Sequence, residues 1–305
     1  MFPSVRHRLI IIIAVLVGGF AWLSAIAPLT AAEGSSGISL MSSRIGTISA
    51  CGLVMAAGLP ALALGLVVSA SGNPLAGVFG GATALALLAA YGGSIEGWYN
   101  SMADRGALPS VYRGLMVELV IWYAGLVAML ILIQRFRPRL RKMLPILAFD
   151  DHLGAELQLR LPRTTALSAG LVCAVVGGLL GSLFLQSSQT AQVMVGLFIA
   201  FAIGGLIGHL LFPQTNPVAI LMSSGVVALI GYGCVLFQFD TQLQMLKAWN
   251  DDNLSIWHRV PALAQGLPIH FASSAVAGSA LGIGWAQGIL VDHRPQPEAG
   301  PKPKT

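Results

Sequence analysis

Eight long apolar segments, separated by short stretches rich in polar residues, glycine and proline, dominate the pattern of this chain. Each runs for roughly 20 residues with few charges, the length at which a helix crosses the hydrocarbon of a bilayer. Lipid offers no hydrogen-bond partners to the backbone, so such segments are helical. The pattern predicts an all-α polytopic membrane protein with transmembrane helices at about 9–31, 45–70, 75–95, 114–134, 165–187, 191–212, 217–237 and 268–291.

The composition supports this class of protein. Of the 305 residues, 55% are hydrophobic and only 10% are charged, whereas a soluble domain carries roughly 25% charged residues. The three cysteines all lie inside apolar segments, and their number and spacing suit neither a disulfide framework nor a metal site. We therefore interpret them as packing residues and expect no metal and no cofactor.

Positive charge predicts the orientation of the chain. Residues 135–163 hold seven lysines and arginines, and the positive-inside rule places them in the cytoplasm. Alternation then leaves twelve of the 17 basic residues inside and five outside, with both termini cytoplasmic. The inverted assignment would carry the seven charges across the membrane, and we reject it. The inner-surface basic cluster comprises Arg135, Arg137, Arg139, Arg141 and Lys142.

This distribution also bears on partners. The net charge of +5 is explained by orientation, so no nucleic-acid partner is expected. The predicted partner is the lipid bilayer of the cell (inner) membrane, with anionic lipids at the cytoplasmic face. The sequence leaves open whether the chain forms a homo-oligomer or joins a membrane complex.

Two similar motifs indicate that the eight segments arose as a tandem repeat. Asn73-Pro74 opens the third segment and Asn216-Pro217 opens the seventh, where asparagine suits a helix cap and proline the first helical position. A tyrosine–glycine pair, an outer loop with tryptophan and a proline follow in the same order in both halves. Both halves begin inside, which predicts parallel repeats. The predicted organisation is a first four-helix repeat at 1–141, a basic amphipathic linker at 142–163, a second repeat at 164–291 and a disordered cytoplasmic tail at 292–305.

The first segment has an alternative interpretation. Basic residues followed by an apolar run, with Thr30-Ala31-Ala32 as a cleavage site, are typical of a signal peptide. The apolar run is longer than the usual 7–15 residues of such peptides. We therefore expect a retained first helix.

Glu118 and His270 are the best candidates for a polar site. They occupy equivalent positions in the two halves, about one turn inside the outer ends of the fourth and eighth segments. Ionisable groups within a membrane are costly and usually functional, and an acid beside an imidazole can pass protons. The alternative is that both side chains reach interfacial water.

The two outer loops are the second candidate, as gates over a central cavity, as a docking surface or as an aromatic belt at the interface. Their residues of interest are Trp98, Tyr99, Asp104, Trp249, Asp251, Asp252, Trp257 and His258.

Small residues recur on helix faces, for example Gly204-Gly205-x-x-Gly208 and Gly278-x-x-x-Gly282. Such faces let helix backbones approach closely in lipid. They predict tight packing within the bundle rather than a ligand site.

No motif in the chain names a reaction. A paired-histidine metalloprotease motif, a phosphate-binding glycine loop and a Gly-x-Ser-x-Gly elbow are all missing. We expect a protein that is not an enzyme, although a membrane-embedded lipid enzyme using Glu118 remains an alternative. The favoured function is a transporter or channel for a neutral or lipid-like solute, and the main alternative is a scaffold or accessory subunit of a membrane complex.

Overall fold

The computed structural model describes residues 5–30, 38–41, 43, 45–95, 108–145, 164–213, 215–238 and 260–292. Within these residues the chain is mainly helical, and an isolated β-bridge pairs Thr30 with Ile38. The predicted all-helical class is confirmed. Six helices are long and apolar enough to cross a membrane: α1 (Val5–Leu23), α3 (Thr47–Ser71), α6 (Leu108–Met143), α7 (Thr164–Phe184), α8 (Thr190–Leu211) and α9 (Val218–Gln238).

Two further apolar segments complete the bundle. The first is α4 (Pro74–Ala90), a shorter apolar helix of 17 residues. The second runs over residues 268–292 as three consecutive pieces, namely α11 (Pro268–His270), a π-helical turn η4 (Phe271–Ala275) and α12 (Val276–Asp292). We call it the last helix. Short helices α2 (Ile26–Leu29) and η3 (Ala262–Gln265) lie in the connections.

Side-chain contacts show which helix ends lie together in the first part of the chain. His7, near the start of α1, is 2.9 Å from the hydroxyl of Ser71 at the end of α3. Arg137, near the end of α6, donates to backbone carbonyls at the same place. Asn73, before α4, donates to Gln287 in the last helix at 2.9 Å. We call this end of the molecule the basic end.

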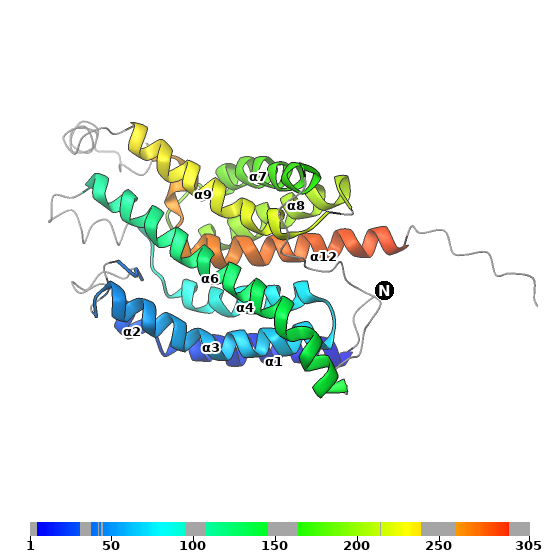
Figure 1. Cartoon of the computed structure of the whole chain (residues 1–305). Coiled ribbons are helices and arrows are strands. Elements are labelled where there is room, and N and C mark those ends of the chain that lie inside the picture. Colours follow the sequence, from blue (N-terminus) through cyan, green and yellow to red (C-terminus); the bar gives the residue numbers. More distant parts are fainter. Residues whose placement is uncertain are drawn as a thin grey trace, which may run out of the picture.

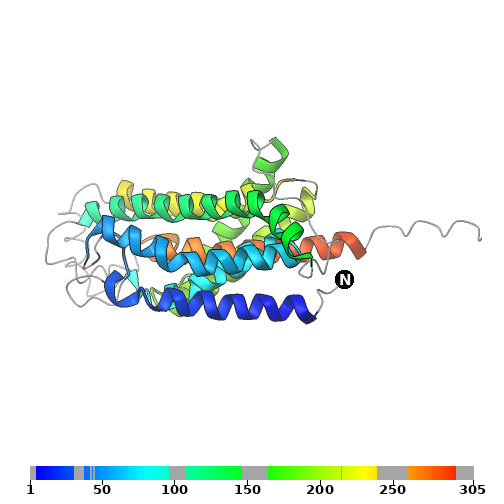
Figure 2. The same cartoon turned by 60° about the horizontal axis from the view of Figure 1, so that its bottom comes forward.

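The second part of the chain follows the same alternation. Gly170, near the start of α7, packs on the backbone of Ala219 near the start of α9, and Gly208 near the end of α8 packs on Ala169. The start of α1 and the end of α12 lie at the same end of the bundle (Figures 1 and 2). The eight segments therefore run alternately towards and away from the basic end.

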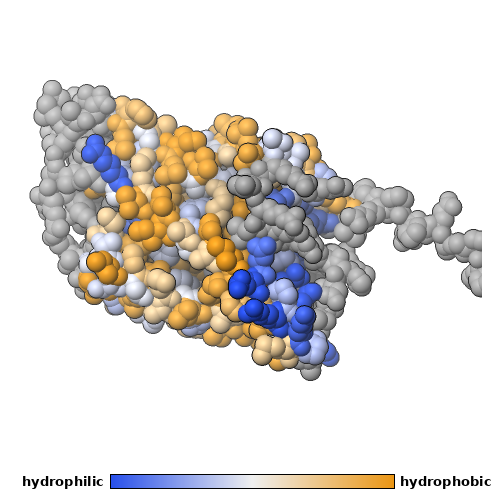
Figure 3. Space-filling view, in the orientation of Figure 1, coloured by the Kyte–Doolittle hydropathy of each residue, from blue (hydrophilic) through white to orange (hydrophobic). Residues whose placement is uncertain are grey.

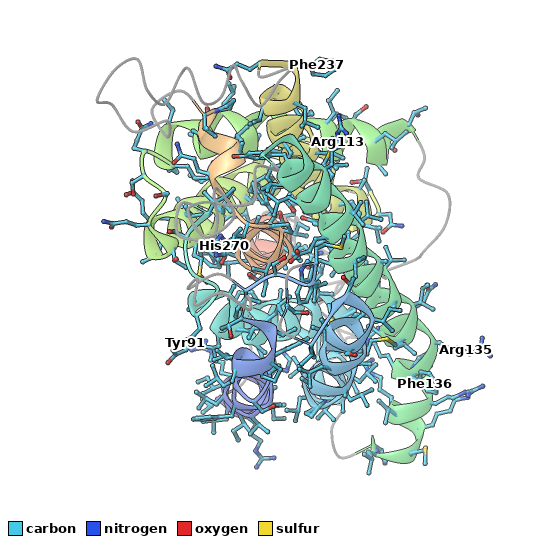
Figure 4. The ribbon with its side chains drawn as sticks, turned by 90° about the vertical axis from the view of Figure 1, so that its left-hand side faces the viewer. Tyr91, Arg113, Arg135, Phe136, Phe237 and His270 are labelled. Carbon is cyan, nitrogen blue, oxygen red and sulfur yellow. The ribbon has the colours of Figure 1, made fainter. Side chains whose placement is uncertain are left out.

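The last helix forms the centre of the bundle. Helices α1, α3 and α4 pack on one another on one side of it, and α7, α8 and α9 lie on the other (Figure 4). Residues 264–280 are all buried, as in a helix surrounded by protein on every side. It packs on α8 and on α4, while α6 contacts both α3 and α9. We call the boundary between the two groups of helices the seam.

The face of the molecule shown in Figure 3 is apolar over most of its described area. Ile48 and Phe237 are 90% and 87% exposed, and many other large apolar side chains on the outer helices are exposed as well. Apolar patches of this extent mark contact with another molecule or with lipid. Hydrophilic side chains gather mainly at the basic end, in the lower right of the same view.

The helix that contains the fourth predicted span is longer than that span. In place of a span at 114–134, α6 runs for 36 residues through to Met143, so Arg135–Lys142 belong to the helix itself. Arg137 and Arg141 make four hydrogen bonds to the carbonyls of Ser69, Ala70 and Gly72. These contacts hold the helix together beyond Pro138, which lacks a backbone donor. The predicted linker beyond residue 145 and the predicted tail after 292 lie outside the described residues.

Candidate polar site at the seam

Glu118 lies in α6 and is 2% exposed. Its carboxylate accepts a hydrogen bond from the Ser39 hydroxyl at 2.8 Å and from the Trp122 indole N–H at 3.3 Å. The backbone amides of Leu40 and Met41 also donate to it. Charge-assisted hydrogen bonds of this kind are about twice as strong as neutral ones. The carboxylate therefore holds residues 38–41, which we call the cover segment, against the helix.

The cover segment is built into the bundle although it belongs to a connection. Ile38, Ser39 and Leu40 are buried. The backbone amide of Ile38 donates to the carbonyl of Gly92 at 2.8 Å, just beyond the end of α4. The segment therefore joins α4 to α6 at the end of the molecule opposite the basic end.

Aromatic rings pack beside the carboxylate. Trp122, four residues after Glu118 on the same helix, lies 6.2 Å from Trp22 of α1 between ring centroids, in a tilted arrangement. Trp122 thus donates to Glu118 with its polar edge and contacts α1 with its ring. The indole N–H of Trp22 has no hydrogen-bond partner within the described part of the chain.

His270 lies in the first turn of the last helix and is 1% exposed. The backbone amide of Leu267 donates to His270 Nδ1 at 3.1 Å. Because an amide N–H can only donate, Nδ1 carries no proton and the neutral ring keeps its proton on Nε2. Nε2 faces the backbone carbonyl of Ala89 at the end of α4. It makes no hydrogen bond of good geometry to any described residue.

A second aromatic cluster holds the chain where the last helix begins. Tyr232 of α9 is fully buried and donates from its hydroxyl to the carbonyl of Gly266 at 2.6 Å. Its ring lies 6.0 Å from Tyr112 of α6 and 6.3 Å from Phe271. A Cβ added to Gly266 would lie 2.7 Å from the Phe271 ring, so this break requires glycine.

Polar contacts continue along the seam towards the basic end. The hydroxyls of Tyr123 in α6 and Ser224 in α9 are 2.6 Å apart and join the two groups of helices. On the π-helical turn, Ser273 bonds to the carbonyl of Ile269, and Ser274 is 4% exposed. π-helical turns inside α-helices are frequent at functional sites. This turn contacts helices from both groups, namely α4, α6, α8 and α9.

The structure places Glu118 and His270 near the same end of the bundle but does not join them. Their hydrogen-bond partners differ, and no ion pair between them occurs. α6 begins at Leu108, so Glu118 lies ten residues inside the helix rather than about one turn inside it. His270 lies only two residues after Pro268, since the proline and the extended backbone of Leu267 start a new helix. Neither side chain reaches the surface, contrary to the alternative of interfacial exposure.

The predicted caps lie at helix starts. The Asn73 side chain accepts from the backbone amide of Leu75 at 2.9 Å, and Pro74 is the first residue of α4. The Asn216 side chain accepts from the amide of Val218 at 3.2 Å, with Pro217 directly before α9. The two asparagines therefore satisfy the same orphan amide at the start of α4 and of α9.

The remaining predicted site residues are placed as follows. Arg137 and Arg141 of the basic cluster contact the end of α3, whereas Arg135, Arg139 and Lys142 are exposed. In the part of the chain that the structure describes, no group of three acidic, histidine or cysteine side chains has the arrangement of a metal site. The outer-loop candidates fall outside the described residues: Trp98, Tyr99, Asp104, Trp249, Asp251, Asp252, Trp257 and His258.

Comparison with known proteins gives no further assignment. No family model, no curated protein and no solved structure matches the chain.

Proposed function

We propose that this chain is a multi-pass transport protein of the cell membrane, a transporter or channel that moves a neutral or lipid-like solute along the seam. The observation that carries the proposal is the buried carboxylate of Glu118, covered by a short segment that hydrogen bonds hold in place. A carboxylate inside a membrane costs several kcal/mol, about 3 on insertion scales, and is usually retained for function. If the cover segment can move away from Glu118, the carboxylate becomes accessible to a solute.

The architecture proposed for this function is eight spans in two parallel repeats. In this scheme α4 and the last helix are the two spans added to the six long helices. Support comes from helix pairing, because α6 packs on α9 and the last helix packs on α4. A twofold axis that exchanges the fourth with the eighth span and the third with the seventh converts one pair into the other. Asn73 and Asn216 cap α4 and α9 with the same type of hydrogen bond, which also supports two repeats.

The orientation of the chain follows from its charges. We place the basic end, with Arg137 and Arg141, in the cytoplasm. The cover segment then faces the outside, and the described arrangement corresponds to a state closed to the outside.

The chemistry of the seam favours a neutral solute. Glu118 already has four donors, from Ser39, Trp122 and the backbone of Leu40 and Met41. His270 is neutral and offers one unused donor at Nε2. Movement of the cover segment would remove three of these donors and leave Glu118 with Trp122 alone, so the opened seam would offer an acceptor at Glu118 and a donor at His270. An uncharged molecule that carries both a hydrogen-bond donor and an acceptor fits these groups.

The test is access of a water-soluble reagent to the seam. Ser274→Cys is a near-isosteric change on the π-helical turn, and a charged methanethiosulfonate added outside should label it in membranes. The background carries Cys51→Ala and Cys234→Ala. Ala61→Cys, buried between α1 and α3, is the matched control and should stay unlabelled. Complete protection of Ser274→Cys would contradict transport.

The cover segment gives this test a second arm. Ser39→Ala removes one hydrogen bond to a carboxylate, worth roughly 1.5 kcal/mol, so the seam should open about tenfold more often. Labelling of Ser274→Cys should accelerate by that factor, whereas labelling of Ala61→Cys should not change. An unchanged rate would show that residues 38–41 do not control access.

The second candidate function is a non-catalytic scaffold or accessory subunit. Continuous burial of residues 264–280 and the tight contact of Gly278 and Gly282 with the backbone of α8 favour it. A scaffold needs no opening of the seam. Lasting protection of Ser274→Cys, together with loss of a co-purifying membrane partner on mutation of exposed residues, would support this function.

A further inference from the structure

The end of α6 presents two different sets of cations. Arg137 and Arg141 form an anchor pair, because both donate to the carbonyls that end α3. Arg135, Arg139 and Lys142 are exposed and lie four and three residues apart, which places them on one side of the helix. We call these three residues the lipid face. Arg139 also lies over the ring of Phe136, with 5.8 Å between the guanidinium carbon and the ring centroid.

The anchor pair fixes the height of the lipid face. α3 is an apolar helix of 25 residues. In a bilayer, its end would mark the boundary of the apolar layer. Because the anchor pair binds that end, the exposed cations are held at the level of the boundary. Phosphate groups of phospholipids lie at this level. Phe136, Met143 and Leu144 are 37%, 76% and 44% exposed and give the same helix an apolar side that can enter the lipid.

From this arrangement we infer that Arg135, Arg139 and Lys142 form a binding surface for the headgroups of anionic phospholipids. The inference is independent of transport. Cations at this level attract anionic headgroups. The one acidic residue of α6, Glu118, lies 17 residues before Arg135. Figure 4 shows Arg135 and Phe136 at the edge of the bundle, away from the central helix. The anchor pair is not assigned this role, because each of its side chains donates two hydrogen bonds to carbonyls at the end of α3.

The test measures which lipid lies beside the helix. Met143→Cys, in the Cys51→Ala and Cys234→Ala background, carries a fluorophore, and the full chain is placed in phosphatidylcholine nanodiscs. Phosphatidylglycerol or phosphatidylcholine with a nitroxide on the upper acyl chain is added as quencher. The mole fraction of labelled phosphatidylglycerol that quenches half of the fluorescence should be about fivefold lower than that of labelled phosphatidylcholine. The reason is that one basic residue near the surface contributes about 1 kcal/mol to the binding of an anionic lipid.

Two variants with the same change in net charge distinguish an effect of the lipid face from an effect of the overall charge of the protein. Replacing Arg135, Arg139 and Lys142 together by Gln should bring the ratio of the two half-quenching fractions to about one. Replacing Arg294, Lys302 and Lys304 by Gln removes three cations that are not part of α6 and should leave the ratio at its original value. The inference fails if the first variant keeps the preference, if the second loses it, or if the parent shows none.

Folding is controlled in the same samples. The three side chains of the lipid face are exposed, so its triple variant should elute and melt like the parent in detergent. If the triple variant does not fold like the parent, a second variant carries Arg135→Lys and Arg139→Lys and retains Lys142, so that all three charges are kept. This variant should restore both folding and the preference for phosphatidylglycerol. A folded double-lysine variant without the preference would equally overturn the inference.

Discussion

Gly282 offers the most direct test of the central packing, through substitution by alanine. A Cβ at this position would overlap the carbonyl oxygen of Ala202 and lie 2.7 Å from the backbone nitrogen of Leu206, both in α8. Ordinary contacts begin at 3.4 Å, so the two helices would have to separate by at least about 0.7 Å. Backbone atoms cannot rotate away as a side chain can. The expected loss of stability is therefore at the upper end of overpacking, about 3 kcal/mol.

The matched control is Gly284→Ala in the same helix, where an added Cβ meets no atom within 4 Å. It should be neutral or slightly stabilising, because alanine favours a helix over glycine by up to about 1 kcal/mol. Thermal unfolding in detergent, followed by size-exclusion chromatography, compares the two variants with the parent. A loss of about 3 kcal/mol changes the ratio of folded to unfolded protein roughly 100-fold. Equal melting of Gly282→Ala and Gly284→Ala would refute the close contact of α8 with α12.

Two further predictions concern polar contacts. Replacing both Arg137 and Arg141 by Gln should destabilise the end of α3 by roughly 2 kcal/mol, so amide hydrogen exchange in its last turn should rise about 30-fold. Replacing Arg135 and Arg139 by Gln should leave that exchange rate unchanged. Equal exchange rates in the two double variants would argue against the anchor pair. Tyr123→Phe and Ser224→Ala should show a coupling of about 0.6 kcal/mol in a double-mutant cycle of unfolding, because each removes the same hydrogen bond; strictly additive effects would exclude that bond.

The helices were predictable from the sequence where hydrophobicity alone decides them. Helices α7, α8 and α9 begin and end within a few residues of the predicted segments, since polar or proline-containing turns separate them. The length of α6 was not predictable by the same criterion. Its last turns are polar, and what extends them is the contact of Arg137 and Arg141 with a helix 65 or more residues away in sequence.

The candidate site shows the same limit. Glu118 and His270 stand out in a sequence because ionisable residues are rare in apolar segments. Ser39 does not, since it lies in a polar connection with many serines, and its role depends on how that connection folds back on α6. The alternation of Ile38, Ser39 and Leu40 was the one signal that this connection contains buried residues. The sequence also suggested equal positions for Glu118 and His270, but Pro268 starts a new helix in only one half.

Burial of the first half of the last helix on every side has a consequence for biosynthesis. Translation proceeds from the N-terminus, so the helix that fills the middle of the bundle leaves the ribosome after the other described helices. Until it arrives, α4 and α8 lack the partner on which each packs, and their small-residue faces are open to lipid or to chaperones. Assembly of this protein in the membrane is therefore completed from the outside inwards, by insertion of its core as the closing step.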